Sequence, residues 1–329
     1  LAASVSFPRL DEVRHVVQSM QQHGVDVDAR YARAAVSVAP DLLRSTATPE
    51  TMGGDRYAIC CLEKIYVCEA GNGKPIAEFD APFGGYVDFA LCILIDSRYI
   101  VAGFQRKGAR RRSGKTAPDV MPPPAGMVLF DLQSSSHSPV ASIEHPGTIN
   151  QMRLSPNGRD LAVGTRKGLL GLVRLNLETL QADVPWAELV LPPQPAHTLA
   201  VRDLVWLSES GTLATVSNDG TCAIWELDAA GFADQKTLSQ KAADGIREVR
   251  RRVGSGNAIW RVAATSEGDR LATVGSDRIV RIWDTSSGLE LISLEPRNGS
   301  VVALRFSPDD QFLSIAESNG RIDVIRLTE

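Results

Sequence analysis

The sequence predicts an all-β fold built from a small sheet that is repeated along the chain. The strongest observation is a segment that occurs twice, as residues 213–226 and again as residues 271–284. In both copies an alternating strand leads to a tight turn containing an Asp, and a second strand ends in Trp-Glu or Trp-Asp. Helical patterning is scarce after residue 40, and short alternating runs favour strands. Because one such unit cannot bury both faces of its sheet, several units must pack together.

Polar side chains recur at fixed places around this repeat. They are His197, Thr215, Asp219 and Trp225 in one copy, and Thr273, Asp277 and Trp283 in the next. The pattern resembles the tryptophan–aspartate (WD) repeat β-propeller family, whose four-stranded blades recur every 40 to 45 residues, roughly. The resemblance implies that the His, the hydroxyl, the acid and the indole of one blade form a single hydrogen-bonded chain. Ser255 stands where the second copy would have its His.

The chemistry of these side chains is consistent with a structural role. An imidazole can donate from one ring nitrogen and accept at the other, so it can link a hydroxyl to a carboxylate. A buried indole N–H needs an acceptor. Losing one member leaves its partners unsatisfied, which costs about 1–3 kcal/mol. We therefore interpret the full set as structural, and a catalytic pairing of His197 and Asp219 with Thr215 is the weaker alternative.

Other copies of the repeat are less complete. One begins at His145, but Val163, Lys167 and Val173 replace its hydroxyl, acid and indole. The last copy begins at Val301 and has Ile325 in the Trp position, an earlier one lies around residues 96–131, and Tyr57–Phe79 aligns with Leu271–Leu294. We therefore predict six visible four-stranded repeats, with seven blades as the alternative, in a single propeller domain over residues 34–329.

The amino-terminal residues 1–33 differ from the rest. Leu10, Val13, Val17 and Met20 have helical spacing, which predicts one short amphipathic helix in this extension. The following segment, Ala34–Val38, reads as a lone strand. We expect it to pair with Arg321–Leu327 and close the ring, since closure removes an open sheet edge.

Two basic segments are the main candidates for contact with a partner. The insertion at residues 105–125 and the connection at residues 238–256 should emerge on the same face, because strands of a blade alternate in direction. Their basic residues are Arg106, Lys107, Arg110, Arg111, Arg112, Lys115, Arg247, Arg250, Arg251 and Arg252. We expect this face to bind another protein with an acidic surface. Binding of nucleic acid or phosphoinositide is less favoured, because aromatic residues do not interleave with the charges, and a merely solvated loop is the plainest alternative.

Several function classes find no support in the sequence. Residues 109–116 fit a loose phosphate-loop pattern, but the prolines that follow prevent the helix such a loop needs. The five cysteines show no metal-ligand spacing, and we interpret them as small buried residues in a reducing compartment. The net charge of −4 argues against coating of a polyanion, and no apolar run is long enough to span a membrane. We expect no cofactor and no metal.

The sequence therefore predicts a non-enzymatic scaffold that mediates protein–protein interactions within a multi-subunit assembly, in the cytoplasm or alternatively in the nucleus. One alternative is a sensor or substrate-recognition module of a larger signalling enzyme. Another is a propeller that binds an anionic ligand such as RNA or phosphoinositide. The WD motifs specify architecture and leave the partner and the oligomeric state open.

Overall fold

The structure, a computed structural model, describes residues 56–61, 64–69, 74–83, 86–95, 98–107, 123–134, 138–177, 185–207, 211–226, 257–294, 297–319 and 321–327. Two compact units divide the chain, one within residues 7–149 and one within residues 150–329. The predicted amino-terminal helix and the lone strand Ala34–Val38, with its predicted pairing, fall outside the described residues.

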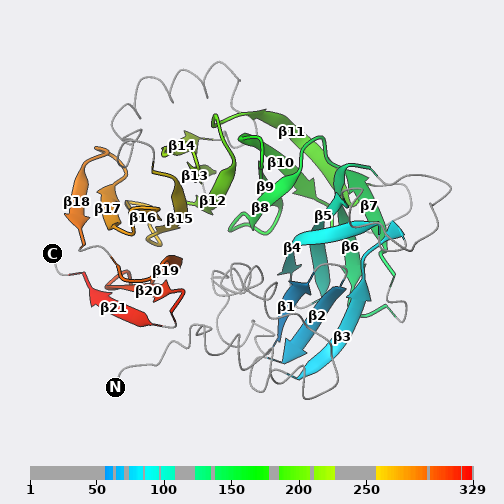
Figure 1. Ribbon diagram of the computed structural model, residues 1–329. Helices are drawn as coiled ribbons and strands as arrows, with labels where there is room; N and C mark the ends of the chain where they lie inside the picture. Colours follow the sequence, from blue (N-terminus) through cyan, green and yellow to red (C-terminus); the bar gives the residue numbers. More distant parts are fainter. Residues whose placement is uncertain are drawn as a thin grey trace. The chain divides into compact units, whose positions relative to one another are not determined.

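The first unit contains two antiparallel sheets (Figure 1). The first sheet has the order β1 (Arg56–Cys61), β2 (Lys64–Glu69), β3 (Pro75–Asp80), and the second β4 (Val87–Ile95), β5 (Tyr99–Arg106), β6 (Ala125–Asp131), β7 (Ala141–Glu144). A shared core lies between them, in which the ring of Phe130 packs against those of Phe79 and Phe89 at centroid distances of 4.9 and 6.1 Å.

The first sheet differs in one respect from the sequence alignment. Aligning Tyr57–Phe79 with Leu271–Leu294 equates β1 with the second strand of a later repeat. In the structure β1 packs beside β4, the first strand of the next sheet, as first strands do elsewhere in the chain. Strand β1 therefore takes the place of a first strand.

The second unit contains four antiparallel sheets, each formed by consecutive strands (Figure 1). The third sheet comprises β8 (Ile149–Leu154), β9 (Asp160–Thr165), β10 (Leu169–Leu175) and β11 (Ala187–Pro195), and the fourth comprises β12 (Val201–Trp206), β13 (Thr212–Ser217) and β14 (Cys222–Glu226). The fifth sheet comprises β15 (Ile259–Ala264), β16 (Arg270–Gly275), β17 (Val280–Asp284) and β18 (Glu290–Ser293), and the sixth comprises β19 (Val301–Phe306), β20 (Phe312–Glu317) and β21 (Ile322–Arg326). The described residues thus form six sheets at the positions of the six predicted repeats, three of them with four strands and three with three.

Consecutive sheets of this unit share their hydrophobic cores. On β13, Leu213 belongs to the core between the third and fourth sheets, whereas Ala214 and Val216 belong to the core between the fourth and fifth. This division follows from the two-residue period of a strand, which sends successive side chains to opposite faces. Trp225 and Trp283 each pack into the core shared with the preceding sheet. Each Trp therefore joins two repeats.

In three sheets the turn between the first and second strands has the same hydrogen-bonding pattern. Its first hydroxyl accepts a hydrogen bond from the backbone N–H five residues later, and it donates to a side-chain oxygen within the turn. These hydroxyls belong to Ser155, Thr265 and Ser307. The fourth residue of the turn has a positive φ, which is 73° at Gly158, 72° at Gly268 and 56° at Asp310.

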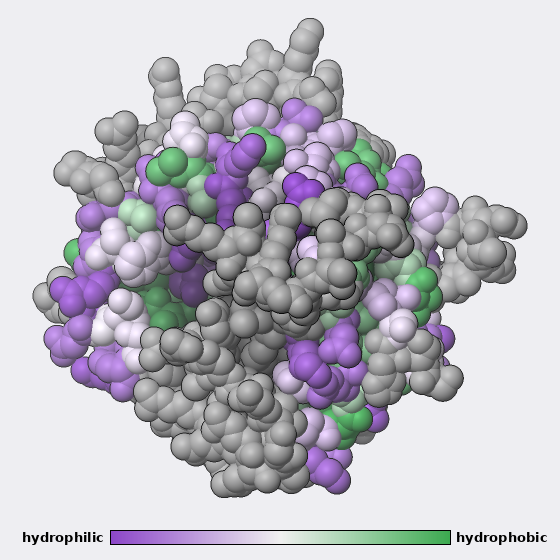
Figure 2. Space-filling model, turned by 45° about the vertical axis from the view of Figure 1, so that its right-hand side comes forward, coloured by the Kyte–Doolittle hydropathy of each residue, from purple (hydrophilic) through white to green (hydrophobic). Residues whose placement is uncertain are grey.

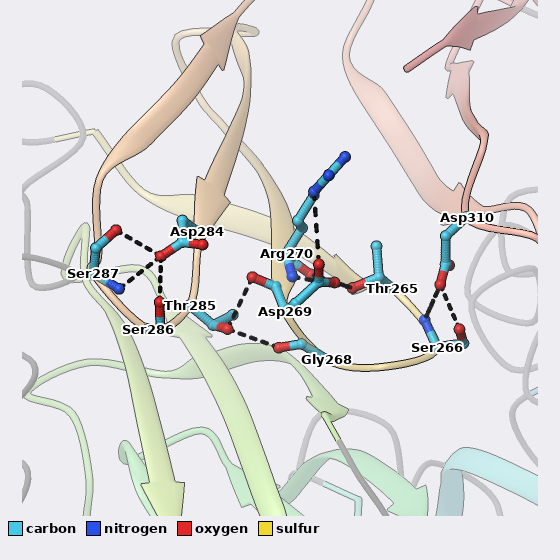
Figure 3. A network of polar contacts seen from close by, with 10 residues as sticks. All are labelled: Thr265, Ser266, Gly268, Asp269, Arg270, Asp284, Thr285, Ser286, Ser287 and Asp310. Atoms are coloured by element: carbon cyan, nitrogen blue, oxygen red, sulfur yellow. Dashed lines mark hydrogen bonds and ion pairs between the residues drawn. The ribbon is translucent and has the colours of Figure 1, made fainter. Parts of the chain in front are cut away.

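Asp310 is the residue other than glycine at the fourth position of these turns, and the contacts of its side chain explain why it is tolerated there. Its carboxylate oxygens accept hydrogen bonds of 3.0 and 2.9 Å from the backbone N–H of Ser266 and a further bond from the Ser266 hydroxyl (Figure 3). Ser266 lies in the corresponding turn of the preceding sheet. The left-handed backbone costs about 1–2 kcal/mol in a residue other than glycine, and the contact between sheets offsets this cost.

The contact of Asp310 can be separated from its backbone strain by two substitutions. Asp310→Gly removes the carboxylate and relieves the strain, while Asp310→Ala removes the carboxylate and keeps the strain. We expect Asp310→Ala to be less stable than Asp310→Gly by about 1 kcal/mol in urea unfolding. Glu267→Ala, at an exposed position of the neighbouring turn, should change stability by less than about 0.5 kcal/mol. Equal stability of the two Asp310 variants would contradict this account.

Candidate functional site

His197 is held at its position by the turn of the preceding sheet. The carbonyl of Gly168, between β9 and β10, accepts hydrogen bonds of 3.0 and 2.9 Å from the backbone N–H groups of Ala196 and His197. Gly168 has φ +78°, and a Cβ there would lie 2.2 Å from the carbonyl oxygen of His197. Only glycine therefore permits this approach, and it aims the imidazole at the fourth sheet.

The four residues predicted for this repeat lie together, joined through a fifth. The Nε2 of His197 is 2.8 Å from the Thr215 hydroxyl, which also accepts a 2.8 Å bond from the indole N–H of Trp225. The Nδ1 of His197 is 2.8 Å from the Thr221 hydroxyl, and that hydroxyl donates to Asp219 over 2.6 Å. Direct contact between His197 and Asp219 is longer, at 3.4 Å. Thr221 is thus part of the seam, although the sequence pattern does not mark it.

The protons of this network can be placed by elimination. A carboxylate only accepts, so the single proton of Thr221 points to Asp219. Thr221 must then accept from the Nδ1–H of His197. With a neutral ring, Nε2 accepts from Thr215, and Thr215 accepts from Trp225. The hydrogen bonds of the network therefore run in one direction, from Trp225 to the negatively charged Asp219. Every donor in the network has an acceptor.

The carboxylate of Asp219 is the electrostatic end of the network. Burial by itself raises the pKa of Asp219, but the adjacent imidazole of His197 and the hydrogen bonds from Thr221 and the backbone N–H of Thr198 outweigh it and hold that pKa well below its usual range. The side chain of His197 is 1% exposed and Thr215 is fully buried. The base and the hydroxyl are therefore closed to a substrate, and their arrangement stabilises the seam between sheets.

The second copy of the pattern keeps part of this arrangement and replaces the rest. The indole N–H of Trp283 donates to Thr273 over 2.8 Å, as in the first copy. The acid Asp277 instead forms an ion pair of 2.7 Å with Arg281, which comes from the adjacent strand β17. Ser255, at the position of the His, lies outside the described residues. An arginine thus neutralises the acid in the fifth sheet.

His145 begins the copy in which the hydroxyl is replaced by Val163. Its Nδ1 lies 2.7 Å from the carbonyl of Gly147, while its buried Nε2 has no partner among the described residues. Desolvation lowers the pKa of His145, although the bond to Gly147 opposes that shift. A histidine that is buried in this way is held neutral.

Most of the basic residues predicted to bind a partner lie outside the described residues. These are Arg110, Arg111, Arg112, Lys115, Arg247, Arg250, Arg251 and Arg252. Arg106, at the end of β5, is exposed. Lys107 is only 8% exposed, so its ammonium is less available than the expected rim position implies.

A group of arginines on first strands escaped the sequence analysis. The charges of Arg153 on β8, and of Arg202 and Asp203 on β12, all act on Arg261 on β15. The guanidinium of Arg153 pairs with Asp203 at 2.8 Å, and both side chains are more than nine-tenths buried. These residues come from three repeats, so no local pattern marks them.

Side chains of this group also connect the first strands of neighbouring sheets. Asp203 accepts from the backbone N–H of Val262 at 3.2 Å, and the Nε of Arg261 donates to the carbonyl of Val302 at 2.6 Å. The indole of Trp206 donates to the carbonyl of Arg153 at 3.1 Å. The four first strands β8, β12, β15 and β19 are thereby linked in sequence.

The turns at the other ends of the strands are occupied by their own hydrogen bonds (Figure 3). Hydrogen bonds from Ser287 and Ser286 lower the pKa of Asp284 to about 2. The Thr285 hydroxyl donates to the carbonyls of Gly268 and Asp269 at 2.8 and 2.9 Å. These polar groups stabilise turns and offer no obvious reactive side chain.

The described surface gives few further candidates. Figure 2 shows hydrophobic residues in small separate patches among hydrophilic ones on one face. In the described part of the chain no group of His, Cys, Asp and Glu could hold a metal ion, and no helix there is long and apolar enough to cross a membrane. Cys68, Cys92 and Cys222 are buried thiols, as expected of small core residues, and burial raises the pKa of Cys222 to about 12.

Repeated antiparallel sheets, cores shared between consecutive sheets and a Trp–Thr hydrogen bond in two repeats define a WD-repeat β-propeller fold. Residues 190–226 and 247–284 match the family profile described as "WD domain, G-beta repeat". The solved structure of the Cps50 (Swd1) β-propeller domain of Myceliophteria thermophila aligns with a TM-score of 0.58 and 15% identity, covering 84% of this chain and 82% of that one. The resemblance to the WD-repeat propeller family is therefore confirmed.

Curated proteins are similar over parts of the chain. THO complex subunit 3 of Arabidopsis thaliana is 23% identical over 44% of this chain and 42% of its own length. Coronin-7 of Pongo abelii is 30% identical over 41% of this chain and 14% of its own length. A probable cytosolic iron-sulfur protein assembly protein 1 of Kluyveromyces lactis is 35% identical over 27% of this chain and 25% of its own. The matched segments span less than half of each of these relatives.

Removing the shared hydroxyl of the seam tests its structural weight. Thr215→Val leaves both the indole of Trp225 and the Nε2 of His197 without a partner, and we expect the free energy of unfolding to fall by about 1–3 kcal/mol. Thr215→Ser should retain most of the stability. Thr273→Val is the matched control, because only the hydrogen bond from Trp283 is known to be lost there. Urea unfolding of the three variants is the measurement, and a larger loss for Thr273→Val would contradict the role of His197.

The depressed pKa of Asp219 predicts a dependence of stability on pH. A carboxylate whose pKa is lower in the folded chain stabilises the fold above its unfolded pKa of about 3.9, and this contribution is lost as the pH falls towards the folded pKa. We therefore expect the stability difference between wild type and Asp219→Asn to be largest at neutral pH and to shrink below about pH 4. Urea unfolding between neutral and acidic pH measures it, with exposed Glu267→Gln as the control. A difference that does not change with pH would show that Asp219 contributes through shape alone.

Proposed function

We propose that this chain is a non-enzymatic WD-repeat scaffold that binds other proteins within a multi-subunit assembly. The observation that supports this most directly is that the most complete polar network has its hydrogen-bonding groups occupied within the fold. His197, Thr215 and Asp219 form hydrogen bonds with one another, with Thr221 or with Trp225. A propeller whose polar seams serve cohesion leaves its loops and strand ends for recognition.

The names of two relatives support an assembly role. One is named as a subunit of a THO complex, and another as a probable cytosolic iron-sulfur protein assembly protein. We propose that this chain likewise works in a complex, in the cytoplasm or the nucleus, with the basic segments 105–125 and 238–256 contacting an acidic protein surface. Nucleic acid and phosphoinositide are the less favoured anionic partners.

A second candidate function is a recognition module of a larger protein, such as a signalling enzyme. The short coverage of the relatives supports it, because the matched segment is 14% of coronin-7. In both cases the propeller itself binds and does not catalyse.

Affinity purification followed by mass spectrometry tests the scaffold proposal. We expect a tagged chain to recover a specific protein in a near-stoichiometric amount, and Arg110→Ala, Arg111→Ala and Arg112→Ala together to reduce that recovery at least about fivefold, since removal of charge slows electrostatically assisted association. The matched control removes the exposed charges of Arg166 and Lys167. Recovery of nucleic acid with a steep linear fall of log affinity against log salt would instead support the polyanion alternative. Equal recovery by the triple variant and the control would exclude the 105–125 segment as the contact.

A further inference from the structure

The first strands of three sheets carry a β-bulge at the equivalent position near the start of the strand. The pairing register shifts between Val201 and Asp203 on β12, between Ile259 and Arg261 on β15, and between Val301 and Ala303 on β19. Such bulges redirect a side chain and interrupt regular pairing. On β12 the residue within the bulge is Arg202, and on β15 the bulge is followed at once by Arg261. Arg202 and Arg261 therefore lie at or next to bulges on the neighbouring first strands β12 and β15.

The charges at this place do not balance. The charges of Asp203, Arg202 and Arg153 all act on Arg261, and Asp203 is the carboxylate among these described residues. Asp203 is already occupied by the ion pair with Arg153 and by hydrogen bonds from the backbone N–H groups of Leu204 and Val262. Among the described residues named here, three guanidinium groups and one carboxylate leave an excess of two positive charges.

Within the described part of the chain, Arg202 is the member whose side chain has no hydrogen-bond partner. Its guanidinium makes no hydrogen bond or ion pair within the described part of the chain, and its Nε is buried without an acceptor. Arg261 donates from Nε to Val302 and from one terminal nitrogen to the carbonyl of Trp260, which leaves further N–H donors unused. Both residues are half-buried, so their donors are not sealed in the core.

The electrostatic environment supports a binding role for these unused donors. Burial, together with the neighbouring charges of Arg202 and Arg153, lowers the pKa of Arg261, while Asp203 opposes that shift. Partly buried like charges are unfavourable unless an anion compensates them. Guanidinium groups bind phosphate oxygens through paired N–H donors, which suits an oxyanion better than a monatomic ion.

We propose that Arg202 and Arg261, backed by the Arg153–Asp203 ion pair, form a binding site for a dianionic oxyanion of the phosphate monoester class. The charge of such a group equals the excess among the described residues of the cluster. Its source is either a phosphorylated side chain of a partner protein or a free phosphate. The first source deepens the scaffold function proposed above and rests on it, whereas the anion site itself stands on the cluster alone.

A purely structural role of the arginines makes a different prediction. Arg153 and Arg261 hold neighbouring strands together, so their removal weakens the fold under either interpretation. Arg202 has no such contact through its side chain, and a structural cluster would gain from losing its uncompensated charge. Arg202→Gln therefore separates binding from folding, and Arg159→Gln, at an exposed turn position, is the matched control.

The test is thermal unfolding of the full chain in inorganic phosphate, with sodium chloride at equal ionic strength as reference. We expect a saturable rise in melting temperature, by about 2–4 °C at ten times the dissociation constant. The rise should persist in Arg159→Gln and disappear in Arg202→Gln, whose circular dichroism without phosphate should match wild type. An equal rise in both variants, or no saturable rise in wild type, overturns the site.

A second arm identifies the source of the anion. Binding of a degenerate peptide library with one fixed phosphoserine is compared with the same library without phosphate and with inorganic phosphate. Affinity of the phosphorylated library at least tenfold above inorganic phosphate, and lost in Arg202→Gln, assigns the site to a phosphorylated partner. Equal affinity assigns it to free phosphate. Because affinity purification tests the scaffold independently of Arg202, failure of the anion site and failure of the scaffold function remain distinguishable.

Discussion

A three- or four-stranded sheet with apolar residues on both faces must pack against a neighbouring sheet on each face. The rest of the structure depends on this requirement. Leu213 and Ala214 are neighbours on β13, yet they belong to cores shared with different sheets. Each hydrophobic core in the second unit is therefore held jointly by two repeats. A repeat removed from its neighbours would expose one complete face, which at roughly 25 cal/mol per Å² of apolar surface is a large loss.

Two-sided burial forces the polar groups at the seams to find partners inside the fold. The fourth sheet does so through His197, Thr215, Thr221 and Asp219, and the fifth sheet does so through an Arg281–Asp277 pair. These are two solutions to the same problem, since a buried carboxylate needs either several donors or an opposite charge. His145, whose copy has Val163 instead of a hydroxyl, keeps an unsatisfied ring nitrogen among the described residues.

The first strands carry a different balance between stability and recognition. Arg153 and Asp203 form a buried ion pair whose desolvation cost is offset by well-aligned hydrogen bonds. Arg202 has no such compensation, and a fold selected for stability alone has little reason to keep a charge there. Local charge imbalance of this kind is more typical of binding sites than of cores.

Much of the fold followed from the sequence because its signals are periodic and local. Alternation within residues 213–226 and 271–284, a tight turn and a terminal Trp predicted the sheets. The resemblance to the WD-repeat family implied that the side chains of His197, Thr215, Asp219 and Trp225 meet. The tertiary structure decided what depends on neighbours far apart in sequence: that Thr221 completes the seam, that Arg281 replaces the histidine, and that β1 is a first strand. It also decided that Lys107 is buried and that charged residues of three repeats act on Arg261. Periodicity in a chain reports which face a residue takes on its own strand, whereas convergence across sheets depends on bulges and packing that no single segment encodes.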